Sequence, residues 1–161
     1  MAQVRQMKQS EKQRFRQLTD HYGLTKDDFW FSPQGWAVIS RNGIDRIATR
    51  MGLEIHLWIE PDLCDISKNQ VVIKALTKLP DGRDLQTYGE SNETNLKGGA
   101  KGYPVAMAEK RAISRLVLKA SEFYQIAGVL GEDEASGAEQ HVSGGDSGLQ
   151  RLARTPAKGA Q

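Results

Sequence analysis

Residues 53–90 contain the pattern that most restricts how this chain can fold. Every second residue at the start of the segment is apolar, at Leu53, Ile55, Leu57 and Ile59. This period of two predicts a half-buried strand. A second apolar run covers 71–79, turn residues that include Asp81-Gly82 follow it, and 85–90 is the expected return strand. Consecutive strands at hairpin distance favour an antiparallel sheet.

Helical patterns flank the predicted strands. A short apolar strand at 36–40 precedes Asn42, which suits the cap of a helix that ends at Gly52. Pro104 suits the first turn of a second, longer helix that runs to about Tyr124. We therefore predict an α+β fold, in which an antiparallel sheet made of the hairpin and its flanking strands packs against a long C-terminal helix.

Both ends of the chain differ in composition from its middle. Residues 1–16 hold five basic residues and one acid, a bias that fits either a phosphate-binding arm or a solvated helix face. Beyond residue 131 glycines are frequent and large apolar residues are few, which predicts disorder. The expected organisation is a basic helical arm at 1–24, one folded domain at 25–130 and a disordered Gly-rich tail at 131–161.

Composition excludes several classes of protein. The chain has 161 residues, enough for one domain and a tail. Its single cysteine, Cys64, cannot form an intramolecular disulfide, and the sequence has neither a signal-peptide core nor about 20 consecutive apolar residues. We therefore expect a soluble cytoplasmic protein with no membrane association. A net charge of +2 does not identify a nucleic-acid binder, so the distribution of the charges has to decide.

The predicted helix at 104–124 carries two stripes. Small and apolar residues form one of them, at Ala108, Ala112, Leu116 and Ala120. Arg111, Arg115 and Lys119 form a basic stripe beside it. At 1.5 Å per residue the basic side chains follow one another in steps of about 6 Å, close to the phosphate spacing of an extended single strand. A solvated flank of an amphipathic helix explains the same residues, so both interpretations stay open.

A glycine-rich loop precedes this helix. Its basic residues are Lys97 and Lys101, and Lys110 follows in the helix. Backbone N–H groups at a helix start, together with lysines, are suited to binding a phosphate. The loop sequence GGAKGYP does not match G-x-x-x-x-G-K-[ST], so we expect no ATP hydrolysis and no nucleotide cofactor. The expected role of the loop is contact with DNA.

Other chemistry has weak support in the sequence. Glu60, Asp62 and Asp65 are the acids nearest to a nuclease-like arrangement with Lys74. Val72 stands where a further metal-binding acid is needed. We therefore expect no metal site and no catalytic residues.

Aromatic side chains are candidates for stacking on bases where they are exposed. Trp58 alternates with the apolar face of its strand and is the best candidate for partial exposure, as a stacking or a subunit-interface residue. The other candidates are Trp30, Phe31, Trp36, Tyr88 and Tyr103. We expect most of these in the core.

The order of segments between Gly43 and Tyr124 forms a larger motif. A helix ends at Gly52, a tryptophan-bearing strand follows, and a hairpin turns at Asp81-Gly82 and returns into Tyr88-Gly89-Glu90-Ser91. A loop with glycine and lysine then leads to a long helix. In this order and spacing the chain resembles the annealing domain of the Rad-fifty-two superfamily of single-strand annealing proteins, including its phage members.

The match with the family's long helix runs without gaps from Ala108 to Ala120. It includes the alanines, a serine or threonine position, and a DNA-contacting basic residue at Lys119. Leu118 and Glu122 stand where the family has two further basic residues. The resemblance therefore implies a DNA groove that is built differently here, with Arg111 and Arg115 as the substitutes.

The resemblance implies an oligomeric ring or helical filament that holds single-stranded DNA with its bases exposed for pairing. Annealing of this kind serves homologous recombination and consumes no ATP. The implied setting is a bacterial or phage-infected cell, and the implied partners are single-stranded DNA, other copies of the chain, and a single-strand-binding protein or exonuclease. The expected DNA-binding residues are Lys119, Arg115, Arg111, Lys110, Lys101, Lys97, Arg46 and Arg50.

Two alternatives remain beside this expectation of a binding protein that is not an enzyme. One is a small metal-dependent nuclease with Glu60, Asp62 and Asp65 near its site. The other is a protein-interaction scaffold whose acidic segment Glu132-Asp133-Glu134 docks a partner.

Overall fold

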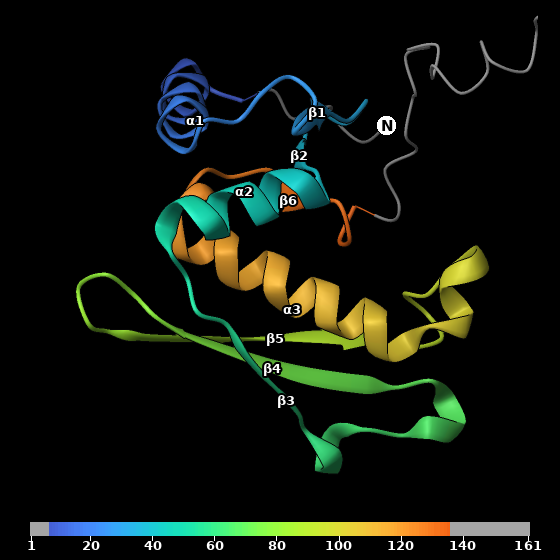
Figure 1. Ribbon diagram of the computed structural model, residues 1–161. Coiled ribbons are helices and arrows are strands. Elements are labelled where there is room, and N and C mark those ends of the chain that lie inside the picture. Colours follow the sequence, from blue (N-terminus) through green and yellow to red (C-terminus); the bar gives the residue numbers. More distant parts are fainter. Residues whose placement is uncertain (1–6, 136–161) are drawn as a thin grey trace, which may run out of the picture.

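Helix α3 (Pro104–Ala120) lies at the centre of the fold (Figure 1). A three-stranded sheet covers one side of this helix, and α2 (Arg41–Met51) and β6 (Val129–Gly131) cover the other. The structure is a computed structural model, and it describes residues 7–135. Residues 1–6 of the predicted arm and 136–161 of the predicted tail lie outside this range.

The sheet beside α3 is antiparallel. It consists of β3 (His56–Ile59), β4 (Val71–Lys78) and β5 (Asp84–Ser91), in that order. The predicted hairpin and the predicted α+β class are therefore confirmed. Alternate residues of the sheet, among them Ile73 and Ala75, pack against the small-residue stripe of α3.

The contact between α3 and β5 is close because Gly89 has no side chain. A Cβ atom on Gly89 would lie 2.2 Å from the carbonyl oxygen of Ala108 and 2.2 Å from the backbone nitrogen of Ala112. Two residues further on, the buried Ser91 Oγ donates a hydrogen bond to the Pro104 carbonyl at 2.7 Å. The Tyr88-Gly89-Glu90-Ser91 element thus fixes the first half of α3 on the sheet.

A second sheet lies on the other side of α3, in the order β1-β2-β6. β1 (Phe29–Phe31) pairs antiparallel with β2 (Ala37–Ile39), and β2 pairs in parallel with β6. The sequence pattern predicted β2 and missed β1 and β6. The predicted tail also begins too early, since Gly131 belongs to β6 and Ala135 is buried.

Helix α1 (Gln9–Tyr22) is part of the folded unit and not a separate arm. Phe15, Leu18 and Tyr22 are buried in one hydrophobic cluster with residues of β2, α2 and α3, such as Ile39. The basic composition of α1 therefore belongs to its solvent side.

The helix ends follow local capping rules. Ser40, and not Asn42, caps α2, because its side chain accepts a hydrogen bond from the backbone nitrogen of Gly43. Gly52 ends α2 with a φ of 63°. Helix α3 stops at Ala120, short of the predicted Tyr124, and Glu122 follows it with a φ of 67°.

Short 3-10 turns complete the connections, at η1 (Pro61–Leu63), η2 (Ile66–Lys68), η3 (Gly98–Gly102) and η4 (Phe123–Gln125). Among residues 7–135 there is no helix with the length and apolar character needed to traverse a bilayer.

Candidate nucleic-acid interface

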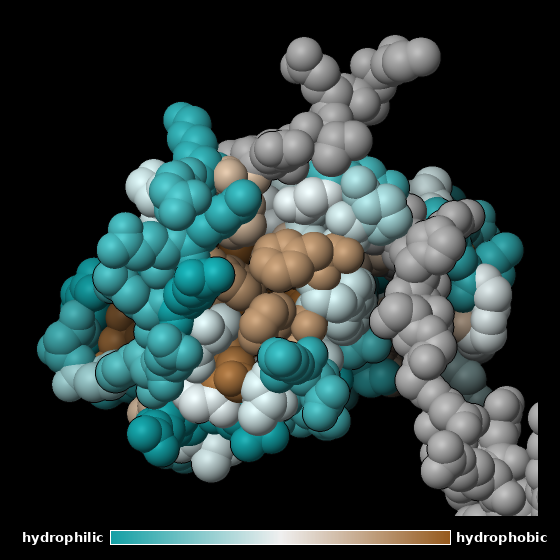
Figure 2. All heavy atoms as spheres, turned by 90° about the horizontal axis from the view of Figure 1, so that it is seen from above, coloured by the Kyte–Doolittle hydropathy of each residue, from teal (hydrophilic) through white to brown (hydrophobic). Residues whose placement is uncertain are grey.

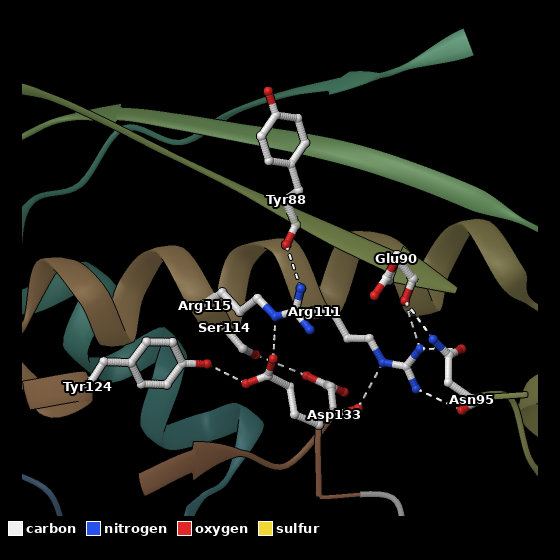
Figure 3. Close-up of polar contacts among 9 residues, drawn as sticks. Tyr88, Glu90, Asn95, Arg111, Ser114, Arg115, Tyr124 and Asp133 are labelled. Atoms are coloured by element: carbon white, nitrogen blue, oxygen red, sulfur yellow. Dashed lines mark hydrogen bonds and ion pairs between the residues drawn. The ribbon is translucent and has the colours of Figure 1, made fainter. Parts of the chain in front are cut away.

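Arg111, the first residue of the predicted basic stripe, is buried inside the fold with 4% of its surface exposed. Its guanidinium donates hydrogen bonds to the carbonyl oxygens of Glu90 (2.8 Å), Asn95 (2.9 Å) and Asp133 (3.0 Å), and to Asn95 Oδ1 (2.7 Å) (Figure 3). Burial lowers the pKa of Arg111 below its ordinary value. The prediction of an exposed cation at this position is therefore corrected: Arg111 ties α3 to β5, to the loop at Asn95 and to the segment after β6.

Arg115 is half-buried and paired. Its Nη1 donates to the Tyr88 carbonyl at 2.9 Å, and its Nε forms an ion pair with Glu134, which also accepts a hydrogen bond from the Tyr124 hydroxyl (Figure 3). Burial alone lowers the pKa of Arg115, but the hydrogen bond and charge of Glu134 outweigh it, and the net pKa is raised. Burial and the same carboxylate raise the pKa of Tyr124.

These two arginines have a structural role at the edge of the sheet. β5 is an edge strand, and along it the guanidinium groups of Arg111 and Arg115 donate hydrogen bonds to the carbonyl oxygens of Glu90 and Tyr88. Side chains that cover a free strand edge prevent its pairing with other chains. Arg111 and Arg115, whose spacing in the stripe is close to that of phosphates, therefore bind carbonyl groups of the same molecule.

The predicted lysines are exposed. Lys97 and Lys101 lie at η3, Lys110 lies in the first half of α3, and Lys119 lies in its last turn. None of the four has an ion pair within residues 7–135. About 14 Å of helix separates Lys110 from Lys119, so these two lysines of α3 form no continuous row of exposed charge.

The two predicted arginines of α2 differ in their surroundings. Arg46 pairs with the buried carboxylate of Asp28 at 3.1 Å, which also accepts hydrogen bonds from the backbone and hydroxyl of Thr25. Arg50 is exposed and lines an open hollow of about 630 Å³ together with Tyr22 and Arg46. Arg46 therefore joins α2 to the residues before β1, and Arg50 is the more accessible of the two charges.

The face of the β3-β4-β5 sheet that points away from α3 carries a row of three side chains across the strands, which we call the sheet row: Trp58, Lys74 and Tyr88. The strand register places Trp58 opposite Lys74 and Lys74 opposite Tyr88, so all three project from one face. Trp58 is 48% and Tyr88 42% exposed. The Lys74 Nζ lies 5.8 Å from the centre of the Trp58 ring, a cation-π distance.

The surroundings of the sheet row extend this surface. The His56 ring stacks on Trp58 with its centre 6.1 Å away. A shallow hollow of about 330 Å³ lies beside Trp58 and Lys74, and its other lining residues are Ile59, Glu60, Leu76 and Gln86. In Figure 3 the Tyr88 ring points away from α3 while its carbonyl oxygen faces Arg115. No helix or strand of the described chain covers this face of the sheet (Figure 1).

Exposed rings beside a cation suit one kind of ligand in particular. Proteins that bind single-stranded nucleic acid stack bases on aromatic side chains and hold phosphates with positive charge. The sequence pattern singled out Trp58 and Tyr88 as separate stacking candidates, but it did not place them together or add Lys74. Only the strand register brings the three side chains into one row.

The acids named for the two alternative functions differ in their surroundings. Asp65 accepts hydrogen bonds from Ser67 and forms an ion pair with Lys68. Within residues 7–135 no three His, Cys, Asp or Glu side chains are grouped so that they could hold a metal ion. The acidic segment that was the predicted docking site, Glu132-Asp133-Glu134, also forms hydrogen bonds within the molecule. Glu132 accepts a hydrogen bond from the Arg41 backbone at 2.9 Å, and Asp133 accepts one from Ser114 at 3.1 Å.

Three comparisons complete the description of the site. No protein-family model, no curated protein and no solved structure was found to match this chain.

Proposed function

We propose that this protein binds single-stranded DNA and anneals complementary strands without consuming ATP. The sheet row of Trp58, Lys74 and Tyr88 carries the proposal, because it offers two exposed rings for bases and a cation between them on a face that no helix or strand of residues 7–135 covers. Stacking is tolerant of base sequence, since every base has an aromatic face. An annealing protein needs this tolerance, because it must hold any strand.

The assignment of charges within this proposal differs from the one that the sequence suggested. Arg111 and Arg115 donate hydrogen bonds to carbonyl groups of β5, and Arg46 forms an ion pair with Asp28. The exposed cations left for phosphates are Lys97, Lys101, Lys110, Lys119 and Arg50, with Lys74 at the centre of the sheet row. Phosphate contacts position a strand without specifying its sequence, which agrees with the role of an annealing protein.

Assembly and cellular setting belong to the same proposal. An oligomeric ring or filament in a bacterial or phage-infected cell, acting with a single-strand-binding protein or an exonuclease, follows from the resemblance to the Rad-fifty-two superfamily. A chain of low net charge gains a strong local potential when many copies line one track.

The first test replaces the exposed rings. In Trp58→Leu and Tyr88→Leu variants we expect oligonucleotide affinity, measured by fluorescence anisotropy, to fall by about 1–3 kcal/mol per lost stacked base. Tyr88→Phe keeps the ring and should bind as the wild type does. His21→Leu, which removes an exposed ring on α1, is the matched control. Unchanged affinity in both ring-deleted variants would refute the sheet row as the binding surface.

The second test separates annealing from cleavage. Two complementary labelled strands are incubated with the protein and magnesium, with no nucleotide added. Faster duplex formation with full-length strands supports annealing, whereas shortened strands support the metal-dependent nuclease.

A further inference from the structure

An apolar groove lies on the side of the molecule farthest from the sheet row. Phe15 of α1 and Phe29 and Phe31 of β1 line it, with Met7 at one end, and its volume is about 480 Å³. We call it the aromatic groove. Figure 2 looks onto this face and shows apolar side chains gathered at its centre with hydrophilic ones around them. Phe31 is 55% exposed, which is unusual for a ring that also packs 5.8 Å from Phe15.

The rim of the aromatic groove is basic. Lys12 and Arg16 lie one helical turn apart on α1, and both line the groove. Both are exposed, and within residues 7–135 neither has an ion pair. Lys8 precedes them by one more turn and is exposed as well. An occupant of the groove should therefore combine apolar side chains with carboxylates.

The same chain carries a surface of that composition. The segment from the last residue of β3 to the start of η2 exposes three large aliphatic side chains: Ile59 (55%), Leu63 (53%) and Ile66 (78%). Glu60 and Asp62 alternate with them, and neither carboxylate has an ion pair within the described residues. We call residues 59–66 the acidic loop. Isolated exposed aliphatic residues are common, but three within eight positions form a patch that suggests a partner.

The two surfaces cannot meet within one molecule. The aromatic groove lies at the α1 and β1 side of α3, and the acidic loop lies beyond the opposite sheet (Figure 1). Two copies can bring them together. A contact between two different surfaces leaves one of each free at the ends of the pair, so it repeats into a ring or an open filament.

We propose that the acidic loop of one copy docks in the aromatic groove of the next, with Glu60 and Asp62 facing Lys12 and Arg16. The occupant is a second copy of this chain because apolar character and charge are complementary on the two surfaces. The inference rests on the proposed function, in which an assembly of copies anneals the strands. Assembly itself is measured here without DNA, so that its failure and the failure of DNA binding are distinguishable.

Charge reversal tests the contact. A groove variant carries Lys12→Glu and Arg16→Glu, and a loop variant carries Glu60→Lys and Asp62→Lys. In sedimentation velocity of the full chain without DNA, each variant alone should require at least about tenfold more protein to assemble than the wild type. All four side chains lie on the surface, and circular dichroism checks that both variants are folded.

Mixing the two variants gives the decisive result. In an equimolar mixture the acidic groove of one variant meets the basic loop of the other, and the basic groove meets the acidic loop. Assembly of the mixture at wild-type concentrations is therefore expected, although neither variant assembles alone. The matched controls reverse the same number of charges elsewhere, with Lys97→Glu and Lys101→Glu, or with Glu93→Lys and Glu109→Lys, and should assemble as the wild type does.

Three results would overturn the inference. The first is a wild-type chain that stays monomeric at every concentration. This result is expected if a different segment of the same molecule fills the groove. The second is a loop variant that assembles normally, as when two grooves face each other. The third is a mixture of folded variants that does not assemble. Binding of a short oligonucleotide by the groove variant, measured separately, reports on the proposed function, because Lys12 and Arg16 lie away from the sheet row whereas Glu60 lines the hollow beside Trp58.

Discussion

At the scale of single residues, a basic side chain in a helical stripe has two fates that the sequence does not distinguish. Arg111 and Lys119 belong to one predicted stripe, yet Arg111 is 4% exposed and Lys119 lies at the surface. The difference arises from segments distant in the sequence, because Glu90, Asn95 and Asp133 supply the acceptors that surround Arg111. A pattern confined to the helix contains no information about these partners.

Substitutions at Arg111 and Lys119 should therefore affect different properties. Arg111→Leu leaves several buried acceptors without a donor, and we expect a loss of about 3–5 kcal/mol in the free energy of unfolding, as for a broken buried polar network. Lys119→Ala should leave stability within about 0.5 kcal/mol of the wild type. It should instead reduce the slope of log affinity against log salt by about 0.7.

Urea unfolding and oligonucleotide titrations at several salt concentrations measure these two effects. A stable Arg111→Leu protein with a reduced salt slope would return Arg111 to the DNA interface. An unchanged salt slope in Lys119→Ala would remove Lys119 from it.

Gly89 is the residue on which the approach of α3 to β5 depends. A Cβ atom there would meet backbone atoms of Ala108 and Ala112 at 2.2 Å, and backbone atoms cannot rotate away. We expect Gly89→Ala to lower the free energy of unfolding by about 1–3 kcal/mol or more, measured in urea. Gly99→Ala is the matched control, because no atom lies within 4 Å of its added Cβ. Equal stability of the two variants would contradict the close packing.

At the scale of elements, the sequence predicted those with strong local signals. The alternation of β3, the turn of the β4-β5 hairpin, Gly52 at the end of α2 and Pro104 at the start of α3 are local signals, and the predicted hairpin forms. β1 and β6 are three residues each, too short for a period to be recognised. β6 forms because it pairs in parallel with β2, 92 positions earlier, as in the pair Ala37 and Val129.

The junction of β1 and α2 depends on one buried carboxylate. Asp28 is desolvated, which raises its pKa, but hydrogen bonds from Thr25 and the charge of Arg46 outweigh this and hold the pKa below its ordinary value of 3.8. The stabilisation by ionised Asp28 is therefore complete above pH 3.8 and is lost as the pH falls through the lower folded-state pKa.

Acid unfolding tests this junction. The free energy of unfolding of the wild type should fall as the pH decreases below 3.8, and Asp28→Asn should lack that part of the decrease. The stability difference between the two proteins is therefore larger at neutral pH than in acid. Urea titrations across this range measure it, and parallel curves for the two proteins would show that Asp28 is not stabilised by ionisation. Asp45→Asn, at an exposed carboxylate of α2, is the control.

At the scale of the whole molecule, the surfaces with separate tasks face different ways. The sheet row lies on the outer face of the β3-β4-β5 sheet, and the aromatic groove lies beyond α2 on the opposite side. Of the sheet row, Tyr88 on β5 lies farthest from the acidic loop, whose Ile59 and Glu60 line the hollow beside Trp58 and Lys74. The sequence pattern named Trp58 and Tyr88 as stacking candidates but no aromatic groove, because the groove forms only where α1 packs on β1.

This separation predicts how affinity depends on strand length. Under the proposed function we expect one copy to bind a strand of about 4–16 nucleotides, the range for compact single-strand-binding units. In an assembly a longer strand reaches several sheet rows, and linked contacts raise the overall affinity by about 10²–10⁴ without any new kind of contact. The wild type should therefore bind a long oligonucleotide much more tightly than a short one.

The loop variant with Glu60→Lys and Asp62→Lys should lose most of this length dependence, measured as the ratio of long-strand to short-strand affinity within the same variant because Glu60 also lines the hollow beside Trp58. Lysines at the loop add positive charge, so a general gain in binding has to be separated from the loss of linkage. The Glu93→Lys and Glu109→Lys control carries the same added charge, and it should retain the length dependence of the wild type. Equal length dependence in the loop variant and in this control would show that strands are bound by copies that do not assemble through the acidic loop.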